Sequence, residues 1–229
     1  MAVDIRFLGH SAVELKSWDT RVLVDPFITG NPKAPVEAAE LEPTHILLTH
    51  GHQDHYGDII DIAKRTNATV VALTEIAGEI GEQGVENVLN PNFGGTVTFD
   101  WGWVKLVPAW HTAVSPNGTP HVAAGLLIHI GDRLIYHLGD TALFSDMQLI
   151  ARRGNRVDLA LVPIGGHYTM DRFDAVTATE FINAAQTIPC HYDTFPVIEA
   201  DAAAFKQDVQ NAGFSEVIVL EPGGKHRLR

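Results

Sequence analysis

The sequence has little cysteine and no long hydrophobic run. Cys190 is the single cysteine among 229 residues, so an internal disulfide is excluded and a reducing, cytoplasmic location is expected. No apolar stretch approaches the ~20 residues that a membrane-spanning helix needs. The first residues also lack the pattern of a signal peptide. We therefore expect no membrane partner.

Positive charge is also scarce. The chain has 16 basic and 28 acidic residues, which gives a formal net charge of −12. Binding to nucleic acid relies on Lys and Arg that neutralise phosphates, so we expect no nucleic-acid partner. The short basic clusters at 152–156 and 225–229 are better explained as solvated ends of elements. These properties favour a small-molecule substrate and leave open whether the chain forms a homo-oligomer.

Hydrophobic residues make up 45% of the chain, enough for a substantial core, and no composition change marks a linker. We predict one domain over residues 1–229, in which strand-like and helix-like segments alternate in two similar halves. Each half is a β-meander followed by helices, which predicts an α/β fold of two mixed sheets flanked by helices. The expected strands include 5–8, 13–15, 21–24, 69–73, 122–130, 157–164 and 216–220, and the expected helices include 74–83, 142–153, 171–185 and 200–212.

A histidine-rich motif follows the apolar run 46–49. It places His50, His52, Asp54 and His55 within six positions. If the run is a buried strand, the first two histidines project to the same side, and a turn brings the other two side chains close to them. Imidazole and carboxylate together are ligands for zinc, iron or manganese. The motif therefore predicts a metal site.

Three further candidate ligands each follow a strand-like run. They are His111, then Asp140 in Gly-Asp-Thr, then His191. The full pattern, His-x-His-x-Asp-His followed by these three residues in this order, resembles the metallo-β-lactamase superfamily. Further motifs, such as Phe7 to Ala12, Leu23 to Phe27 and Pro163 to Gly165, resemble the small uncharacterised metal-dependent hydrolases related to L-ascorbate-6-phosphate lactonase. The chain departs from that branch at Leu138, Cys190 and Gly166-His167.

The resemblance implies a four-layer αβ/βα sandwich and a site with two divalent metal ions. Zinc is expected, with manganese or iron as alternatives. One ion would be held by His50, His52 and His111, the other by Asp54, His55 and His191, and Asp140 would bridge them. A hydroxide bridging the two metals would then cleave an ester, lactone or phosphoester bond of a small molecule, with Asp54 orienting it.

Four other residues are candidates for the surroundings of the site. Asp25 is expected to hold the free N–H of a metal-binding imidazole, although an Asp before Pro also suits a turn. His10 is expected to line the pocket or to stabilise a turn. His137 is expected to be a hydrogen-bond donor behind the ligands. His167 is expected to act as a general acid or to hold an anionic substrate, with loop packing as the alternative.

Two other functions remain as alternatives. One is a metal-dependent nuclease or phosphodiesterase, which the acidic charge opposes. The other is a di-iron oxidoreductase on the same fold; its first motif usually carries Glu where this chain has Gln53, and it needs a flavin domain for which there is no room.

Overall fold

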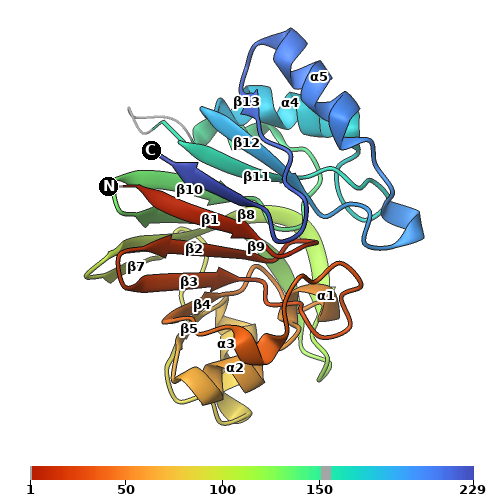
Figure 1. Ribbon diagram of the computed structural model, residues 1–229. Coiled ribbons are helices and arrows are strands. Elements are labelled where there is room, and N and C mark those ends of the chain that lie inside the picture. Colours follow the sequence, from red (N-terminus) through yellow and green to blue (C-terminus); the bar gives the residue numbers. More distant parts are fainter. Residues whose placement is uncertain (1, 151–155) are drawn as a thin grey trace.

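The computed structural model describes residues 2–150 and 156–229. Two seven-stranded sheets lie face to face with helices outside them (Figure 1). The strand order is β14-β1-β2-β3-β4-β5-β6 in the first sheet and β13-β12-β11-β10-β9-β8-β7 in the second. This is the predicted α/β sandwich of two mixed sheets.

Each sheet combines an antiparallel meander with parallel strands. In the first sheet β3, β4, β5 and β6 are parallel, and in the second β10, β11, β12 and β13 are parallel. The strands are β1 (Val3–Phe7), β2 (Val13–Ser17), β3 (Thr20–Val24), β4 (His45–Leu47), β5 (Thr69–Val71), β6 (Val88–Leu89), β7 (Thr96–Phe99), β8 (Gly102–Val114), β9 (Pro120–Ile130), β10 (Arg133–His137), β11 (Leu159–Pro163), β12 (Gln186–Cys190), β13 (Glu216–Val217) and β14 (Lys225–Leu228).

The helices lie outside the two sheets, except α1, which lies at the edge where the strands end. They are α1 (Gln53–Tyr56), α2 (Ile59–Thr66), α3 (Thr74–Glu82), α4 (Arg172–Ile182) and α5 (Ala202–Ala212), with short 3-10 helices at Ala38–Glu40, Ser145–Leu149 and Pro196–Ile198. Helix α4 packs on β11 and α5 on β13, while α3 packs beside β6 (Figure 1). As predicted, Asp171 caps α4, because its carboxylate accepts the backbone N–H groups of Phe173 and Asp174.

A shared core joins the two sheets. Leu15 and Ile46 from the first sheet belong to the same buried cluster as Leu106, Leu126 and Ile188 from the second. The buried residues alternate along β1 and β2, as expected for strands with one face in a core. The interior between the sheets is therefore apolar, and polar side chains gather where the strands end.

Three expectations differ from the structure. Within the expected helix 142–153, residues 145–149 form a 3-10 helix, and residues 151–153 lie outside the described part of the chain. The 225–229 segment, expected to be a solvated end, contains β14, which pairs with β1. His111 was expected after the end of a strand, but it lies inside the long strand β8.

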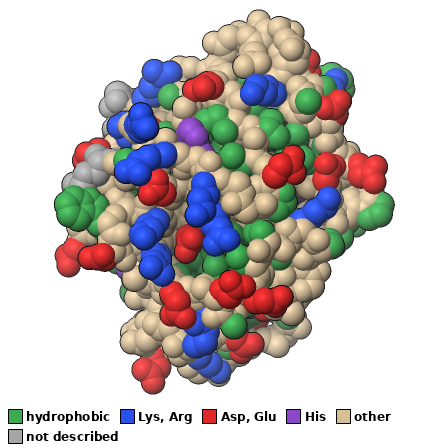
Figure 2. Space-filling view, viewed as in Figure 1, with side chains coloured by type: hydrophobic (Ala, Val, Ile, Leu, Met, Phe, Trp, Pro, Cys, Tyr) green, Lys and Arg blue, Asp and Glu red, His purple; other side chains and the backbone are tan. Residues whose placement is uncertain are grey.

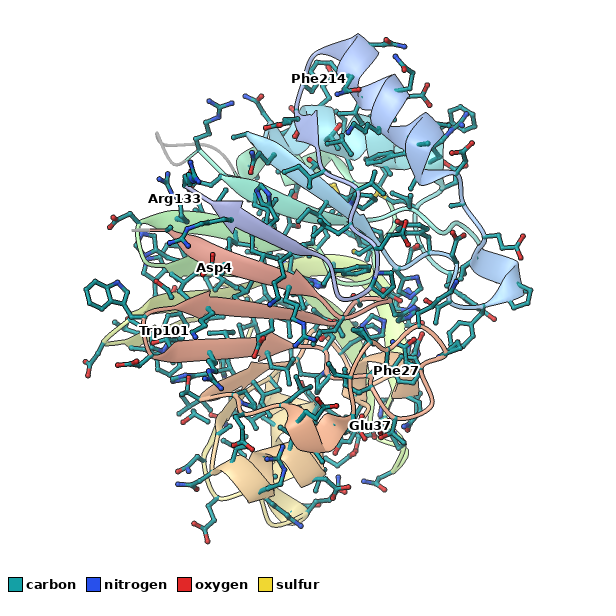
Figure 3. The ribbon with its side chains drawn as sticks, viewed as in Figure 1. Asp4, Phe27, Glu37, Trp101, Arg133 and Phe214 are labelled. Atoms are coloured by element: carbon teal, nitrogen blue, oxygen red, sulfur yellow. The ribbon has the colours of Figure 1, made fainter. Side chains whose placement is uncertain are left out.

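The carboxyl ends of β1, β3, β4, β10, β11 and β12 point to the same edge of the sandwich (Figure 1). Phe27 lies at this edge near α1, and Trp101 lies at the opposite edge (Figure 3). Among the described residues, no helix combines the length and apolar character that crossing a membrane requires.

Candidate metal centre

The loops at the carboxyl ends of the strands carry the predicted site residues. Because parallel strands end at the same edge of a sheet, residues distant in sequence meet there. His10 follows β1, Asp25 follows β3, His50 and His52 follow β4, Asp54 and His55 lie on α1, Asp140 follows β10 and His191 follows β12.

Two compact groups of candidate metal ligands occupy this edge. The first contains His50, His52, His111 and Asp140, and the second contains His10, Asp54, His55 and His191. Within each group the ligand atoms lie within 4.8 Å of one another. Ligands of one zinc ion lie roughly 3.4 Å apart when its bonds are about 2.0–2.1 Å long. The groups thus approach the compactness of metal sites, and the structure brings all seven predicted ligands together.

The carboxylate of Asp140 lies between the two groups. Its Oδ2 atom is 3.8 Å from Nε2 of His50 and 3.6 Å from Nε2 of His111. On the other side, Oδ2 is 3.1 Å from Nε2 of His191, and Oδ1 is 3.3 Å from Nε2 of His55. One carboxylate is therefore within reach of both groups, which is the position that a bridging ligand requires.

The donor atoms at the centre of the cluster fit divalent metal ions. Nε2 of His55, Nε2 of His191 and Oδ1 of Asp140 are buried and have no hydrogen-bond partner in the protein. Buried polar atoms are nearly always paired, and these three face one another across the same small space. Cations coordinated there would satisfy all three atoms, and a set of imidazoles with carboxylates suits zinc, iron or manganese.

The protonation states favour the same interpretation for part of the cluster. Burial lowers the pKa of His50 well below its usual range, so its ring is neutral, as a ligand must be. Burial acts to raise the pKa of Asp140, but His191 and His55 outweigh it and hold the pKa well below its usual range. Burial acts to lower the pKa of His55, but the flanking Asp140 and Asp25 raise it well above the ordinary value.

Asp25 is the carboxylate behind the ligands. It is fully buried, and its Oδ2 atom accepts the Nδ1–H of His55 at 2.8 Å. The same oxygen accepts the hydroxyl of Thr49 at 2.7 Å, and Oδ1 accepts the backbone N–H of Thr49 at 2.8 Å. The Thr49 hydroxyl oxygen is 3.0 Å from Nδ1 of His50. Asp25 and Thr49 thus leave Nε2 of both histidines facing the centre.

The Asp25→Asn variant is expected to bind metal about 10- to 100-fold more weakly than the wild type. The amide side chain keeps one acceptor oxygen, but its NH2 group would face Thr49 and His55, which themselves donate hydrogen bonds to this position. The hydrogen bond that orients His55 is then lost. A competition titration against a chelator of known affinity measures the change. Asp61→Asn, on the exposed face of α2, is the control, and equal affinities of the two variants would contradict the orienting role of Asp25.

His10 supports Asp54 rather than lining the surface of the pocket. It is 1% exposed, with Nε2 at 3.0 Å from Oδ2 of Asp54 and Nδ1 at 2.9 Å from Oγ1 of Thr194. Burial lowers the pKa of His10 to about 4. A neutral ring that donates Nε2–H to Asp54 and accepts the Thr194 hydroxyl satisfies both contacts. His10 and Thr194 are 184 positions apart, so no local sequence pattern predicts their contact.

The structure places the other two predicted histidines outside both groups. His137 is fully buried; its Nε2–H donates to the carbonyl of Ser11, and its Nδ1 accepts the N–H of Gly139, next to Asp140. His167 is exposed, and its ring packs edge-on against Tyr168. Its role as a general acid stays a prediction, since Tyr168 rather than His167 lines the cavity described below.

Two features that position the candidate ligands were not predicted from the sequence. His121 accepts the backbone N–H of Gly51 at 2.8 Å and so holds the His50–His52 loop. In β8 the pairing register shifts between Pro108 and Thr112, and such a bulge redirects side chains. This irregularity allows His111 to reach the site from inside a strand.

An open cavity of about 450 Å³ lies over the two groups. Its floor contains His52, Asp54, His111 and Asp140, and its walls contain Phe27, Tyr168, Phe195 and Val197, with Gln53 at the side. A cavity of this size holds a small molecule. The wall residues were not predicted, because they lie in loops or in the short 3-10 helix Pro196–Ile198, where no periodic pattern marks them.

Comparisons with known proteins agree with this geometry. The profile of the family described as "Beta-lactamase superfamily domain" matches residues 4–191. The chain is 45% identical to a UPF0173 metal-dependent hydrolase of Thermus thermophilus, over 99% of both chains. It is 46% identical to the one of Symbiobacterium thermophilum, over 99% of this chain and 100% of the relative. The solved structure of Igni18, a metallo hydrolase from Ignicoccus hospitalis, superposes with a TM-score of 0.91 at 34% identity and covers 100% of this chain and 99% of its own. The chain therefore belongs to the β-lactamase superfamily and is a metal-dependent hydrolase.

Proposed function

We propose that the protein is a dinuclear hydrolase that cleaves an ester, lactone or phosphoester bond of a small molecule. The observation that carries the proposal is the position of Asp140, whose carboxylate lies within 3.8 Å of ring nitrogens from both groups of candidate ligands. His50, His52 and His111 would hold one ion, and Asp54, His55 and His191 the other. Zinc is the proposed metal, with manganese and iron as alternatives.

Bound divalent ions supply Lewis acidity and lower the pKa of a coordinated water to about 7. The protein supplies the positions of the reacting groups. Asp54 lines the cavity, and its own hydrogen bond from His10 fixes the carboxylate. Burial acts to raise the pKa of Asp54, but the His10 hydrogen bond and the charge of His55 lower it below its usual value. An ionised, fixed carboxylate at the cavity floor can accept a hydrogen bond from the attacking water and orient it.

The substrate carbonyl or phosphoryl group would lie over the cavity floor, between His52 and His111 on one side and Asp54 on the other. Water adds to the carbon or phosphorus atom and gives up a proton, the bond to the leaving oxygen breaks, and that oxygen takes up a proton, so that the reaction is balanced.

After reconstitution, the protein is expected to contain two equivalents of divalent metal per chain, because seven ligands exceed what one tetrahedral site uses. Elemental analysis of the desalted protein measures the content. The His167→Ala protein should keep both equivalents, since His167 lies outside both groups. A content that stays at one equivalent or below under saturating metal would contradict the dinuclear site.

A further inference from the structure

The cavity over the metal centre has a polar floor and an apolar wall. Two phenylalanine rings form one side of the wall, with Phe27 and Phe195 6.4 Å apart between ring centroids. Val197 and Tyr168 complete it, and they are 54% and 56% exposed respectively. Exposed apolar side chains that surround a few polar groups are typical of a binding pocket. The polarity of the wall therefore indicates the polarity of the substrate group that lies beside the reacting bond.

The loop that carries Phe195 and Val197 is braced by its own hydrogen bonds. The N–H of Asp193 donates to the carbonyl of Ile198 at 2.9 Å, and its carboxylate accepts the N–H of Ala200 at 2.9 Å. The ring of Phe195 also packs edge-on against His10, at 5.6 Å between centroids. The apolar wall is thus preformed, and a ligand can use it without first ordering the loop.

The wall of Phe27 is braced in a similar way. The carboxylate of Asp58 accepts the N–H groups of Ile28 and Thr29 at 3.1 Å and 2.8 Å. The ring of Phe27 contacts His10 edge-on, at 5.7 Å between centroids. Both phenylalanines therefore pack on the histidine that holds Asp54, and the wall and the floor of the cavity form one packed unit.

Positive side chains are located elsewhere on the molecule. Within residues 2–150 and 156–229, no Lys or Arg lines this cavity. A group of Lys and Arg side chains lies on the exposed face of β14, β1, β2 and β3, where Figure 2 shows them close together; it comprises Arg6, Lys16, Arg21, Lys225 and Arg227, with Asp4, Glu14, Glu40 and Glu42 on the same surface. An anionic group of a substrate, such as a phosphate distant from the reacting bond, therefore has no Lys or Arg partner among the described residues that line the cavity. Burying such a group without a partner is costly.

We infer that the substrate is a neutral carboxylic ester or lactone with an apolar substituent, held between Phe27, Phe195, Val197 and Tyr168. This inference rests on the proposed hydrolase function and narrows its substrate class. It separates the protein from enzymes that act on phosphorylated sugar lactones, because those substrates carry a second anionic group. The wall residues then determine specificity, whereas the floor residues carry the reaction.

Binding of hydroxamates to the metal-loaded protein tests the cavity without requiring turnover. Hydroxamates chelate metal ions and leave their tail in the cavity. Pentanohydroxamic acid is expected to bind about ten- to fiftyfold more tightly than acetohydroxamic acid, the effect of burying three methylene groups. 4-Carboxybutanohydroxamic acid, with a tail of similar length that ends in a carboxylate, should bind at least about tenfold more weakly than pentanohydroxamic acid. Calorimetry measures all three.

Variants of the wall residues test whether the wall causes the preference for the longer apolar tail. Phe195→Ala should reduce the preference for the pentano over the aceto compound at least about fivefold with unchanged metal content. Phe173→Ala removes an exposed phenylalanine of α4 outside the cavity and should leave the preference unchanged. Because Phe195 also contacts His10, Val197→Lys provides a second variant. It should bind the carboxylate-ended compound more tightly than the wild type does, a gain that general damage to the site cannot produce.

Hydrolysis of p-nitrophenyl acetate, pentanoate and hemiglutarate tests the proposed hydrolase function separately from the inferred substrate class. A higher kcat/KM for the pentanoate, together with the hydroxamate preference, supports both. If no ester is cleaved by metal-loaded protein while the hydroxamate preference holds, the proposed ester hydrolysis is wrong and the apolar pocket stands. If the carboxylate-ended compounds bind and react as well as the apolar ones, or if the hydroxamates do not bind, the inferred substrate class is wrong.

Discussion

The Asp140→Ala protein is expected to lose at least about a thousandfold in kcat/KM, or about 4 kcal/mol of transition-state stabilisation, on any ester that the wild type cleaves. The carboxylate of Asp140 is the group within reach of both sets of histidines. Without it, the imidazoles of the two sets lie close together with no negative charge between them. Metal content should fall with activity, which elemental analysis on the same sample shows.

The control for this variant is Asp146→Ala, which removes an exposed carboxylate from the 3-10 helix Ser145–Leu149. It should keep both metal content and rate. Asp140 lies at a strand end beside the cavity, so its removal creates no large apolar void, and circular dichroism should show a folded protein. Full turnover by Asp140→Ala would exclude a bridging role.

The Gly57→Ala protein is expected to be destabilised by at least about 2–3 kcal/mol. Gly57 ends α1 at φ 43° and ψ −120°, a conformation that side chains with a Cβ rarely adopt. A Cβ at this position would lie 2.3 Å from the carbonyl oxygen of Pro26 and 2.5 Å from Cα of Phe27. The backbone that carries Phe27 would have to move away from residue 57.

Urea denaturation of the metal-loaded protein measures this loss. Gly78→Ala is the matched control, because a Cβ at Gly78 meets nothing within 4 Å. Gly78 lies inside α3, where alanine stabilises a helix by about 0.5–1 kcal/mol relative to glycine. The two substitutions are chemically identical, and opposite signs are expected. A Gly57→Ala protein as stable as the wild type would show that the contact with Pro26 is not restrictive.

The candidate ligands could be proposed from the sequence because four of them follow strand-like apolar runs, and because their order resembles the metallo-β-lactamase pattern; the four are His50, His111, Asp140 and His191. For His50, Asp140 and His191 the run is a parallel strand, and such strands share an edge. His111 shows the limit of this argument. Pro108, in the run before His111, suggests the end of a strand, but β8 continues to Val114. The register shift between Pro108 and Thr112 depends on pairing with β9, which the sequence does not indicate.

Other features depend on contacts between distant segments. The short basic cluster at 225–229 indicated a solvated end. In the structure this segment pairs with β1, which buries Leu228 in the core and leaves Lys225 and Arg227 exposed. The contact between His10 and Thr194 and the wall formed by Phe195 arise only when two loops meet. No periodicity marks such residues, so the apolar character of the cavity was outside the reach of sequence reasoning.

Three residues of the metal centre adopt a backbone conformation that is unfavourable for residues other than glycine. His10, Asp25 and His191 have φ values of 57°, 46° and 53°, in the left-handed region where a side chain costs of order 1–3 kcal/mol unless its surroundings compensate. Glycine would adopt these angles without that cost. At three positions where glycine would fold more easily, the chain instead carries an imidazole or a carboxylate. Within the described residues, Trp18, Asn67, His167, Asn183 and Asp193 also have positive φ values. His10, Asp25 and His191 differ from these because they are buried at the metal centre, where their side-chain chemistry explains why they are not glycine.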